Sequence, residues 1–277
     1  MEKLTTEKVN QMLDAHEAWL SSNGEKGKQA DFTHTNVSGF HFKNRNLSQA
    51  ICIEGSMTHN TFDNCTMSGM NCLSSNMIFN QYNNCMMDKM NLHDAVMDYS
   101  QFYGDVMDFS NMDHTSMQKT SSTFLHIKGA VMDFSNWDDS THTRLQLENC
   151  YADQANLCAK FPEANIIGLE AKTADIRGAG LSSARILDSK LPERFLQIGP
   201  IEVKKDTSTY IGYLPKSDLV QCPPILKDKS VSMKEFEKIV DKLPKNYPSE
   251  KTVRNNLKGA VDMLKFMDKV SKKGLGR

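Results

Sequence analysis

The stretch Ala95-Val96-Met97-Asp98-Tyr99-Ser100 returns in near-copies at Val106-Met107-Asp108-Phe109-Ser110 and at Val131-Met132-Asp133-Phe134-Ser135. The offsets are ten and twenty-five residues, both multiples of five. Counting in fives from Phe32 to Leu157 meets an apolar residue at every position except Ser122 and His142. Helices repeat every 3.6 residues and strands every two, so neither produces this period. The pattern therefore indicates a short structural repeat.

Each group of five residues has a large apolar residue, here called the large position, and a small residue two places earlier, the small position. The pattern is clearest in Ala95-Val96-Met97, Ala130-Val131-Met132 and Ala155-Asn156-Leu157. It resembles the pentapeptide-repeat family. That resemblance implies an all-β solenoid, a right-handed quadrilateral parallel β-helix in which four pentads make one coil. Continued to Leu191, the repeat predicts about eight coils.

Residues twenty apart should then stack in columns. The large positions predict one internal column of aromatic rings, formed by Phe42, Phe62, Tyr82 and Phe102, and others rich in methionine. Glycines two residues after a large position suit corners that need positive φ. The frame slips by one residue between Leu157 and Ala159, which predicts a kink or tight corner there. Five small positions hold large side chains, which predicts local bulging, at Phe40, Arg45, Met70, Met90 and Leu125.

Three parts of the chain are expected. Residues 1–29 contain an N-terminal α-helical cap over residues 5–21, because the end of a solenoid exposes apolar side chains and unpaired edges. Residues 30–192 form the β-helix. Residues 193–277 form a small C-terminal α+β appendage, a basic β-hairpin plus two helices, the first beginning at the capping box Ser232-Met233-Lys234-Glu235 and ending before Pro244 and the second capped by Ser249.

Motifs for chemistry are sparse. The chain has no P-loop, no dinucleotide-binding turn and no nucleophile-elbow or zinc-protease motif, so no enzyme activity, cofactor or metal is expected. The eight histidines do not cluster at ligand spacing, and His142 occupies a core position. The cysteines are expected to be reduced core residues. With no signal core and no long apolar run, a cytoplasmic location and no membrane contact are expected.

Charge is unevenly placed. Residues 30–192 hold 18 acidic and 11 basic residues, whereas residues 193–277 hold 11 and 18. The position directly after the large residue, here called the flanking position, should point outward, and from Met87 to Ala152 it is often acidic. The acidic members are Asp88, Asp98, Asp108, Asp113, Asp133, Asp138, Glu148 and Asp153. Asp can simply serve turns and solubility there. The alternative is a negative surface for a cationic partner.

The resemblance supplies a candidate partner. Some pentapeptide-repeat proteins are similar to duplex DNA in shape and charge and bind type II topoisomerases, which implies a non-enzymatic DNA mimic acting on DNA gyrase, topoisomerase IV or another DNA-binding protein. A scaffold or adaptor is the alternative, with exposed aromatic contacts at Tyr99, Phe109 and Phe134 and a basic tail that docks an acidic partner or nucleic acid. Direct nucleic-acid binding is not expected of the rod. A homodimer stays open.

Overall fold

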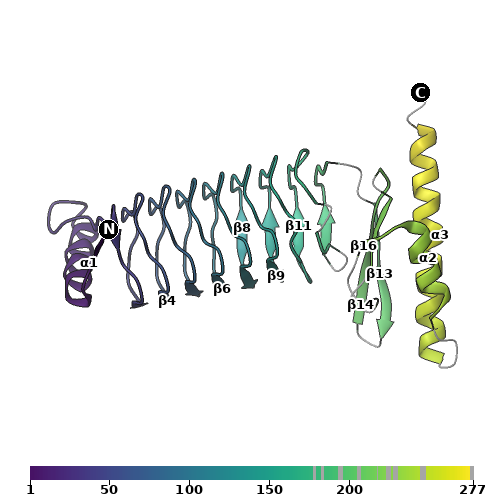
Figure 1. Ribbon diagram of the computed structural model, residues 1–277, viewed down its shortest axis with the longest axis horizontal. Coiled ribbons are helices and arrows are strands. Elements are labelled where there is room, and N and C mark those ends of the chain that lie inside the picture. The colour runs from purple at the N-terminus through teal and green to yellow at the C-terminus, as the bar shows by residue number, and fades with distance from the viewer. Residues whose placement is uncertain are drawn as a thin grey trace.

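The computed structural model describes residues 1–176, 179–181, 184–192, 196–204, 207–216, 218–222, 226, 230–243 and 248–274. Helix α1 (Thr6–Ser21) stands at one end, a stack of coils forms the middle, and a small sheet lies at the other end with helices α2 (Met233–Asp241) and α3 (Pro248–Gly274) (Figure 1). The coils form a parallel β-solenoid, so the expected fold class is confirmed.

Short strands form two faces of the solenoid. One parallel sheet contains β3 (His41–Lys43), β4 (Thr61–Asp63), β5 (Gln81–Asn83), β6 (Gln101–Tyr103), β7 (Ser121–Thr123) and β9 (Thr141–Thr143). The other contains β8 (His126–Lys128), β10 (Gln146–Glu148), β11 (Asn165–Ile167) and β12 (Arg185–Leu187). Single bridges such as Asp31 to Ile51 and Asn36 to Ser56 form the remaining faces. Before the frame slip, paired residues are twenty apart, so four pentads make one coil.

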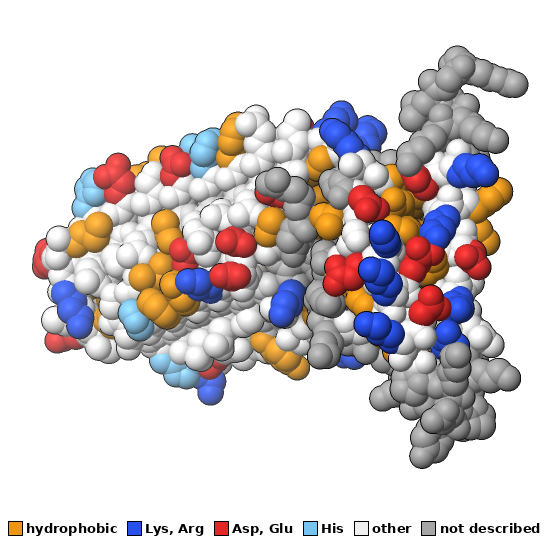
Figure 2. Space-filling model, turned by 45° about the vertical axis from the view of Figure 1, so that its right-hand side comes forward, with side chains coloured by type: hydrophobic (Ala, Val, Ile, Leu, Met, Phe, Trp, Pro, Cys, Tyr) orange, Lys and Arg blue, Asp and Glu red, His pale blue; other side chains and the backbone are white. Residues whose placement is uncertain are grey.

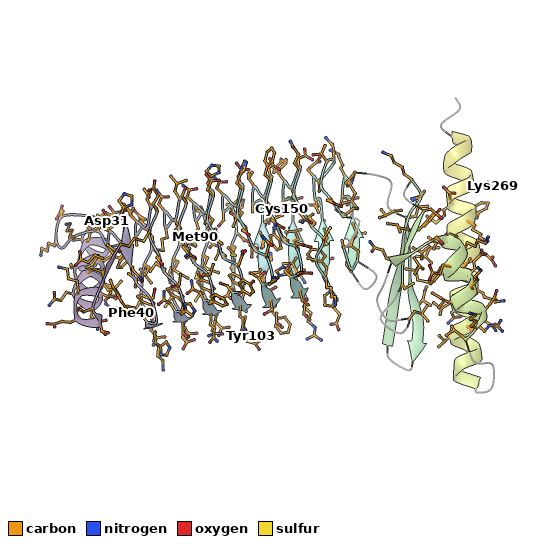
Figure 3. All side chains as sticks on the ribbon, viewed as in Figure 1. Asp31, Phe40, Met90, Tyr103, Cys150 and Lys269 are labelled. Carbon is orange, nitrogen blue, oxygen red and sulfur yellow. The ribbon has the colours of Figure 1, made fainter. Side chains whose placement is uncertain are left out.

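Most pentads bury both their large and their small residue in one continuous core. The predicted aromatic column is present. Ring centroids of Phe42 and Phe62 lie 4.8 Å apart, and Tyr82 lies 5.0 Å from both Phe62 and Phe102. Offset stacking of this kind adds to the dispersion contacts of the core. Figure 3 shows Met90 and Cys150 within the wall of the solenoid. All seven cysteines are outside any disulfide and all except Cys158 are buried, as the core interpretation predicts.

The corners of the coils use a left-handed backbone. Gly39, Gly69, Gly104 and Gly129 have positive φ, as expected. Positive φ also occurs at the equivalent position in most other pentads, here called the corner position, including phenylalanine and lysine. A side chain with positive φ costs energy relative to glycine. The regular ladder of hydrogen bonds around each corner must therefore offset that cost.

The two polar residues of the large positions are partners. Ser122 Oγ lies 2.9 Å from His142 Nδ1, and Ser140 Oγ lies 2.8 Å from His142 Nε2. His142 is completely buried, and this burial lowers its pKa to about 3. It is therefore a neutral core histidine with both ring nitrogens hydrogen-bonded.

A carboxyl group is also buried in the core, at Asp105 in a small position. Its Oδ1 accepts the backbone N–H of Cys85 at 2.6 Å, and its Oδ2 accepts that of Tyr103 at 2.7 Å. Burial raises the pKa of Asp105 to about 7. Asn60 and Asn80 occupy other small positions and likewise accept the N–H of the residue one coil earlier. A small position can therefore hold either an aspartate or an asparagine.

The frame slip is a tight corner, as predicted. Register changes from twenty residues to nineteen, as in Gln146 opposite Asn165, and returns to twenty at Asn165 opposite Arg185. The lost residue is the corner residue, and the N–H of Ala159 donates to the carbonyl of Leu157 at 2.7 Å instead.

The predicted bulging at the five oversized small positions is wrong where the ladder can be followed. Met70, Met90 and Leu125 are buried, and the bridges from Ile51 through Asn71 and Asn91 keep the twenty-residue register. Ala50 and Ser110 lie one coil away from the two methionines in the same column, so small neighbours leave them room. Phe40 is half-buried against the core, and Arg45 pairs with Asp14 of α1 at 2.7 Å.

Helix α1 covers the first coil. Thr5 is its N-cap, and Val9, Leu13 and His16 are buried. His16 contacts the coil directly, because its Nδ1 accepts the N–H of Ala30 at 3.1 Å and its Nε2 lies 3.0 Å from the carbonyl of Ser48. Ahead of the helix, β1 (Glu2–Lys3) pairs in parallel with β2 (Thr35–Asn36). Trp19 is half-buried and stacks on His16.

The C-terminal sheet contains the expected hairpin, β13 (Leu196–Lys204) and β14 (Thr207–Leu214), and two strands that the sequence did not indicate, β15 (Leu219–Gln221) and β16 (Ser230–Val231). Ser232 accepts the N–H of Glu235 at 3.2 Å, which is the predicted cap of α2. Helix α3 begins at Pro248, one residue before the predicted cap Ser249, because proline suits a first helical turn. The stop expected at Pro244 lies outside the described residues.

This sheet also closes the last coils. Leu214 is buried in the same core as the solenoid residues, and Leu219 packs against it. The N–H of Leu181 donates to Oε1 of Gln221 at 3.1 Å, which satisfies a backbone group at the open end.

Among the described helices, none is both long and apolar enough to cross a membrane.

Candidate binding surface

The solenoid presents three outward residues in each pentad: the residue before the large position, the flanking residue and the corner residue. The eight acidic flanking residues are half-buried, and they fall in three columns on three different faces. One column contains Asp88, Asp108 and Glu148, a second contains Asp98 and Asp138, and a third contains Asp113, Asp133 and Asp153. They therefore surround the rod on three sides and do not make a single strip. Figure 2 shows acidic and hydrophobic side chains in separate small groups on the solenoid face in view.

Several of these carboxylates hold the next coil in place. Asp133 Oδ1 accepts the backbone N–H of Asp153 at 2.7 Å, and Asp153 Oδ1 accepts that of Thr173 at 3.2 Å. The same contact joins Asp88 to the N–H of Asp108, Asp108 to that of Lys128 and Asp98 to that of Gln118. Asp98 Oδ1 also accepts the hydroxyl of Ser116 at 2.6 Å. A half-buried backbone N–H without an acceptor is costly, so the carboxylates have a structural role.

Asparagine performs this task elsewhere. When asparagine precedes the large position, its Oδ1 accepts the flanking N–H within the same pentad, as Asn111 does for Asp113 and Asn136 for Asp138. In the five pentads where aspartate supplies the acceptor, the residue before the large position is not asparagine. The flanking N–H of these pentads therefore has as its acceptor either an asparagine of its own pentad or an aspartate of the neighbouring coil. An acidic flanking residue contributes both a hydrogen bond and an outward charge.

Basic side chains lie beside some of these carboxylates. His126 Nδ1 lies 3.0 Å from Asp108 Oδ1, and Lys128 Nζ lies 4.0 Å from Glu148. Burial raises the pKa of Asp108, and His126 opposes this effect. The net negative charge is concentrated in the middle coils. Residues 88–153 hold 11 acidic and 4 basic residues, whereas residues 30–87 hold 3 acidic and 2 basic residues. The middle coils are the acidic part of the solenoid.

Tyr99, Phe109 and Phe134 are exposed corner residues, each in a different column. Tyr99 stacks on Phe79 at 4.8 Å, and Lys119 Nζ lies 5.3 Å from the Tyr99 ring on the other side. Phe134 stacks on His114 at 4.6 Å. Phe109 lies against Gly129, where an added Cβ would approach its ring to 2.7 Å. Exposed aromatic residues that the sequence reasoning missed are Phe79, Tyr103, Phe124 and Tyr151, all outward positions of the same repeat.

The expectation that the histidines do not cluster is wrong. His93 and Asp113 are flanking residues one coil apart, and His114 follows at the corner. His93 Nδ1 lies 3.2 Å from Asp113 Oδ2, and His114 Nδ1 lies 3.0 Å from Asp113 Oδ1. A search for ligands within one pentad misses this group, because His93 is twenty residues from Asp113 and twenty-one from His114. Counting in twenties would have found it.

The basic tail presents mixed charge. Figure 2 shows lysine and arginine side chains gathered with acidic ones at the C-terminal end. Lys258 and Arg254 of α3 pair with Asp241 of α2, and Lys265 contacts Glu237. Met263 and Phe266 are exposed on the same helix. The tail is therefore a surface of paired charges with an apolar element.

The solenoid interior has little free space. Its last coils enclose a cavity of about 20 Å³ with an entirely apolar lining that includes Trp137, Phe161 and Leu181. This is about the space of one water molecule and carries no polar group to orient a substrate. A binding role for the described solenoid therefore depends on its outer surface.

The comparisons with known proteins found likenesses among solved structures only. No family model and no curated protein matches the sequence. Among solved structures, QnrB1, a plasmid-mediated fluoroquinolone resistance protein, is 13% identical over 59% of this chain and 90% of its own, with a TM-score of 0.28. HetL from Nostoc sp., a pentapeptide-repeat protein involved in heterocyst differentiation regulation, is 13% identical over 65% and 96%, with a TM-score of 0.22. Rfr23 from Cyanothece, also a pentapeptide-repeat protein, is 11% identical over 58% and 86%, with a TM-score of 0.17.

Proposed function

We propose that this pentapeptide-repeat solenoid acts by binding another protein, with its acidic middle coils lying in a positively charged groove in the manner of a DNA mimic. The observation that carries the proposal is the placement of charge. Residues 88–153 hold 11 acidic against 4 basic residues, and the acidic flanking residues occupy three faces of the rod. A groove that surrounds a rod would meet negative charge on several sides, as it does with duplex DNA.

The rigidity of the acidic columns supports the proposal. Asp88, Asp98, Asp108, Asp133 and Asp153 each accept a backbone N–H of the next coil, so their charges are held at fixed positions. Coils in a parallel sheet lie roughly 4.8 Å apart, which cannot match phosphates one for one. Long-range attraction does not require such a match, and a preorganised surface loses little side-chain entropy on binding.

The proposed partner class is a DNA-binding protein, and the family resemblance favours a type II topoisomerase. The assay is DNA supercoiling by gyrase and by topoisomerase IV over a series of salt concentrations, with the full chain added. The protein should inhibit the enzyme or protect it from a poison, and the effect should weaken as salt rises and as competing duplex DNA is added. No effect on either enzyme at any salt concentration would contradict the assignment to topoisomerases.

A set of variants that neutralises acidic side chains tests the surface. Asp98→Asn, Asp133→Asn and Asp153→Asn together remove three charges while each amide oxygen can still accept its backbone N–H. The matched control is Asp31→Asn, Glu54→Gln and Asp63→Asn, which removes the same charge from coils outside the acidic middle. The first set should weaken the effect at least tenfold and the control should not. Equal effects of the two sets would show that the middle coils have no special role.

The tail supports the adaptor alternative through one observation. Helix α3 exposes Met263 and Phe266 beside Lys265 and Lys269. An apolar pair on a helix with lysines suits a partner surface that is apolar with an acidic rim. If the adaptor function holds, partner binding survives the three middle-coil substitutions and is lost on Met263→Ser with Phe266→Ser. This comparison also tests whether the chain forms a homodimer, by measuring mass in solution with and without the two substitutions.

A further inference from the structure

The cluster of His93, Asp113 and His114 carries an inference that is independent of the proposed function. We propose that these three side chains form a binding site for one divalent transition-metal ion of the zinc class. Within the described part of the chain, this is the group in which at least three potential ligand atoms lie within 4.8 Å of one another. Two imidazoles and a carboxylate are donors that Zn²⁺ and its neighbours prefer.

The spacing of the donors suits one ion. Asp113 lies between the histidines, with Oδ2 at 3.2 Å from His93 Nδ1 and Oδ1 at 3.0 Å from His114 Nδ1. Ligands of a tetrahedral zinc ion, each at about 2.0–2.2 Å, lie about 3.3 Å from one another. The side chains of His93, Asp113 and His114 are 34%, 26% and 47% exposed, respectively, so small rotations can bring the three donors around an ion.

The backbone beneath the site is fixed by the solenoid ladder. Asn91 pairs with Asn111, directly before Leu92 and Met112. The N–H of Asp94 donates to the carbonyl of Asp113 at 3.2 Å, and that of His114 donates to the carbonyl of Asp133 at 2.9 Å. His114 has φ of 55°, which turns the chain directly after Asp113. Each ligand therefore comes from a rigid element, as a metal site requires.

Neighbouring side chains orient both histidines. Asp94 Oδ2 lies 3.4 Å from Nε2 of His93, on the opposite side of the ring from Asp113. A carboxylate on the far nitrogen fixes the tautomer of a metal-binding histidine and leaves Nδ1 to face the ion. The ring of His114 stacks on Phe134 with centroids 4.6 Å apart and packs edge-on against His93 at 5.5 Å. This support distinguishes the group from an ordinary surface ion pair.

Three protein ligands would leave at least one coordination position open. In zinc sites of this kind a water molecule or a ligand from a partner occupies the open position. The ion would connect the coil that contains His93 to the coil that contains Asp113 and His114. Binding should therefore also stabilise the contact between these two coils.

Titration of the tag-free, chelator-treated full chain with ZnCl₂ by calorimetry tests the proposal, with Co²⁺ absorption as a second readout. We expect one equivalent to bind, with Co²⁺ bands of nitrogen and oxygen ligation and no thiolate charge transfer. His93→Ala or His114→Ala should each weaken binding at least tenfold. Asp94→Asn should weaken it less, because Asp94 only positions His93. Melting curves recorded with a chelator show whether each variant is folded.

The matched control is His126→Ala. His126 and Asp108 form a pair at 3.0 Å on another face of the same solenoid, and the pair has no second histidine. This variant should bind the metal as wild type does. Absence of saturable binding to wild type would overturn the proposal, and so would binding that persists unchanged in folded His93→Ala and His114→Ala proteins. Thiolate charge transfer with Co²⁺ would also overturn it, since the ion would then be held by cysteine.

Discussion

Asp133 accepts the backbone N–H of Asp153 through its Oδ1 at 2.7 Å, one coil along the same acidic column. Two like charges thus lie in neighbouring coils because the first satisfies a polar group of the second. The repulsion between them is screened by water. Asp98 has a comparable structural role, because its Oδ1 accepts both the hydroxyl of Ser116 and the backbone N–H of Gln118.

Asp133→Ala and Asp133→Asn should therefore differ in stability. Alanine leaves the N–H of Asp153 without its acceptor, at a cost of about 1–3 kcal/mol in the free energy of unfolding. Asparagine keeps an oxygen acceptor and should cost less than about 0.5 kcal/mol while removing the same charge. Urea denaturation of the three proteins measures both effects. Equal losses for the two variants would mean that the charge matters and the hydrogen bond does not.

The stacked aromatic column should dominate the stability of the early coils. Phe62 is completely buried between Phe42 and Tyr82. Phe62→Ala should lower the free energy of unfolding by roughly 3–5 kcal/mol, because it removes packing and leaves a cavity. The control is Phe79→Ala, which removes an exposed ring that also stacks on a neighbour and should cost below about 1.5 kcal/mol. Comparable melting shifts in the two proteins would contradict the distinction between inner and outer positions.

His142 should make the protein sensitive to acid. Burial lowers its pKa to about 3, whereas histidine in an unfolded chain titrates near 6.5. Below that value the unfolded state binds a proton that the folded state does not, so stability is full above about pH 6.5 and falls with pH. The loss attributable to His142 is roughly 2–3 kcal/mol between pH 7 and pH 4.5. His142→Phe should flatten the dependence of the unfolding free energy on pH between pH 7 and pH 4.5, measured by urea denaturation. An unchanged slope would be evidence that His142 does not cause the acid sensitivity.

Asp105 should make the protein less stable as pH rises, which is opposite to the effect of His142. Burial raises its pKa to about 7, and aspartate in an unfolded chain titrates near 3.9. The folded state therefore holds the proton over a range in which the unfolded state has lost it. Its contribution to stability is full below about pH 4 and is lost as pH rises to about 7.

Asp105→Asn removes this titration and keeps a side chain that small positions accept, as at Asn60 and Asn80. The variant should be more stable than wild type at pH 8, by roughly 2–4 kcal/mol, with the difference shrinking toward pH 4. Thermal or urea unfolding at the two pH values measures this. A difference that does not depend on pH would show that Asp105 is ionised in the folded core.

The first coil should need helix α1. Deletion of residues 1–24 removes Val9, Leu13 and His16 from the core and exposes Phe32 and the edge at Ala30. End-to-end association or aggregation should follow, because a free solenoid edge can pair with another chain. Light scattering on a sizing column measures the mass. A truncated chain that stays monomeric with an unchanged melting temperature would show that the cap is dispensable.

Parts of this structure could be foreseen because the repeat is local. A period of five with alternating small and large residues, together with the four-pentad coil that the family resemblance implies, places Phe42, Phe62, Tyr82 and Phe102 in one column. The missing residue after Leu157 likewise appears as a tight corner because every coil inherits its register from the one before. The capping box at Ser232 acts within one helical turn, so the sequence also located the start of that helix.

Other features depend on which coils lie next to each other and on how deeply each outward residue is buried. The acidic flanking residues are recognisable in the sequence, but their distribution over three faces and their hydrogen bonds to the next coil arise from stacking. Ser122 and His142 are exceptions in the repeat until the stack brings them within 2.9 Å of each other. His93 and His114 are 21 residues apart and meet only because one coil takes twenty. The five-residue repeat, together with the family resemblance that it carries, indicated the fold and the inner columns. The tertiary structure decided the partners of the outward and polar residues, since those contacts form between coils.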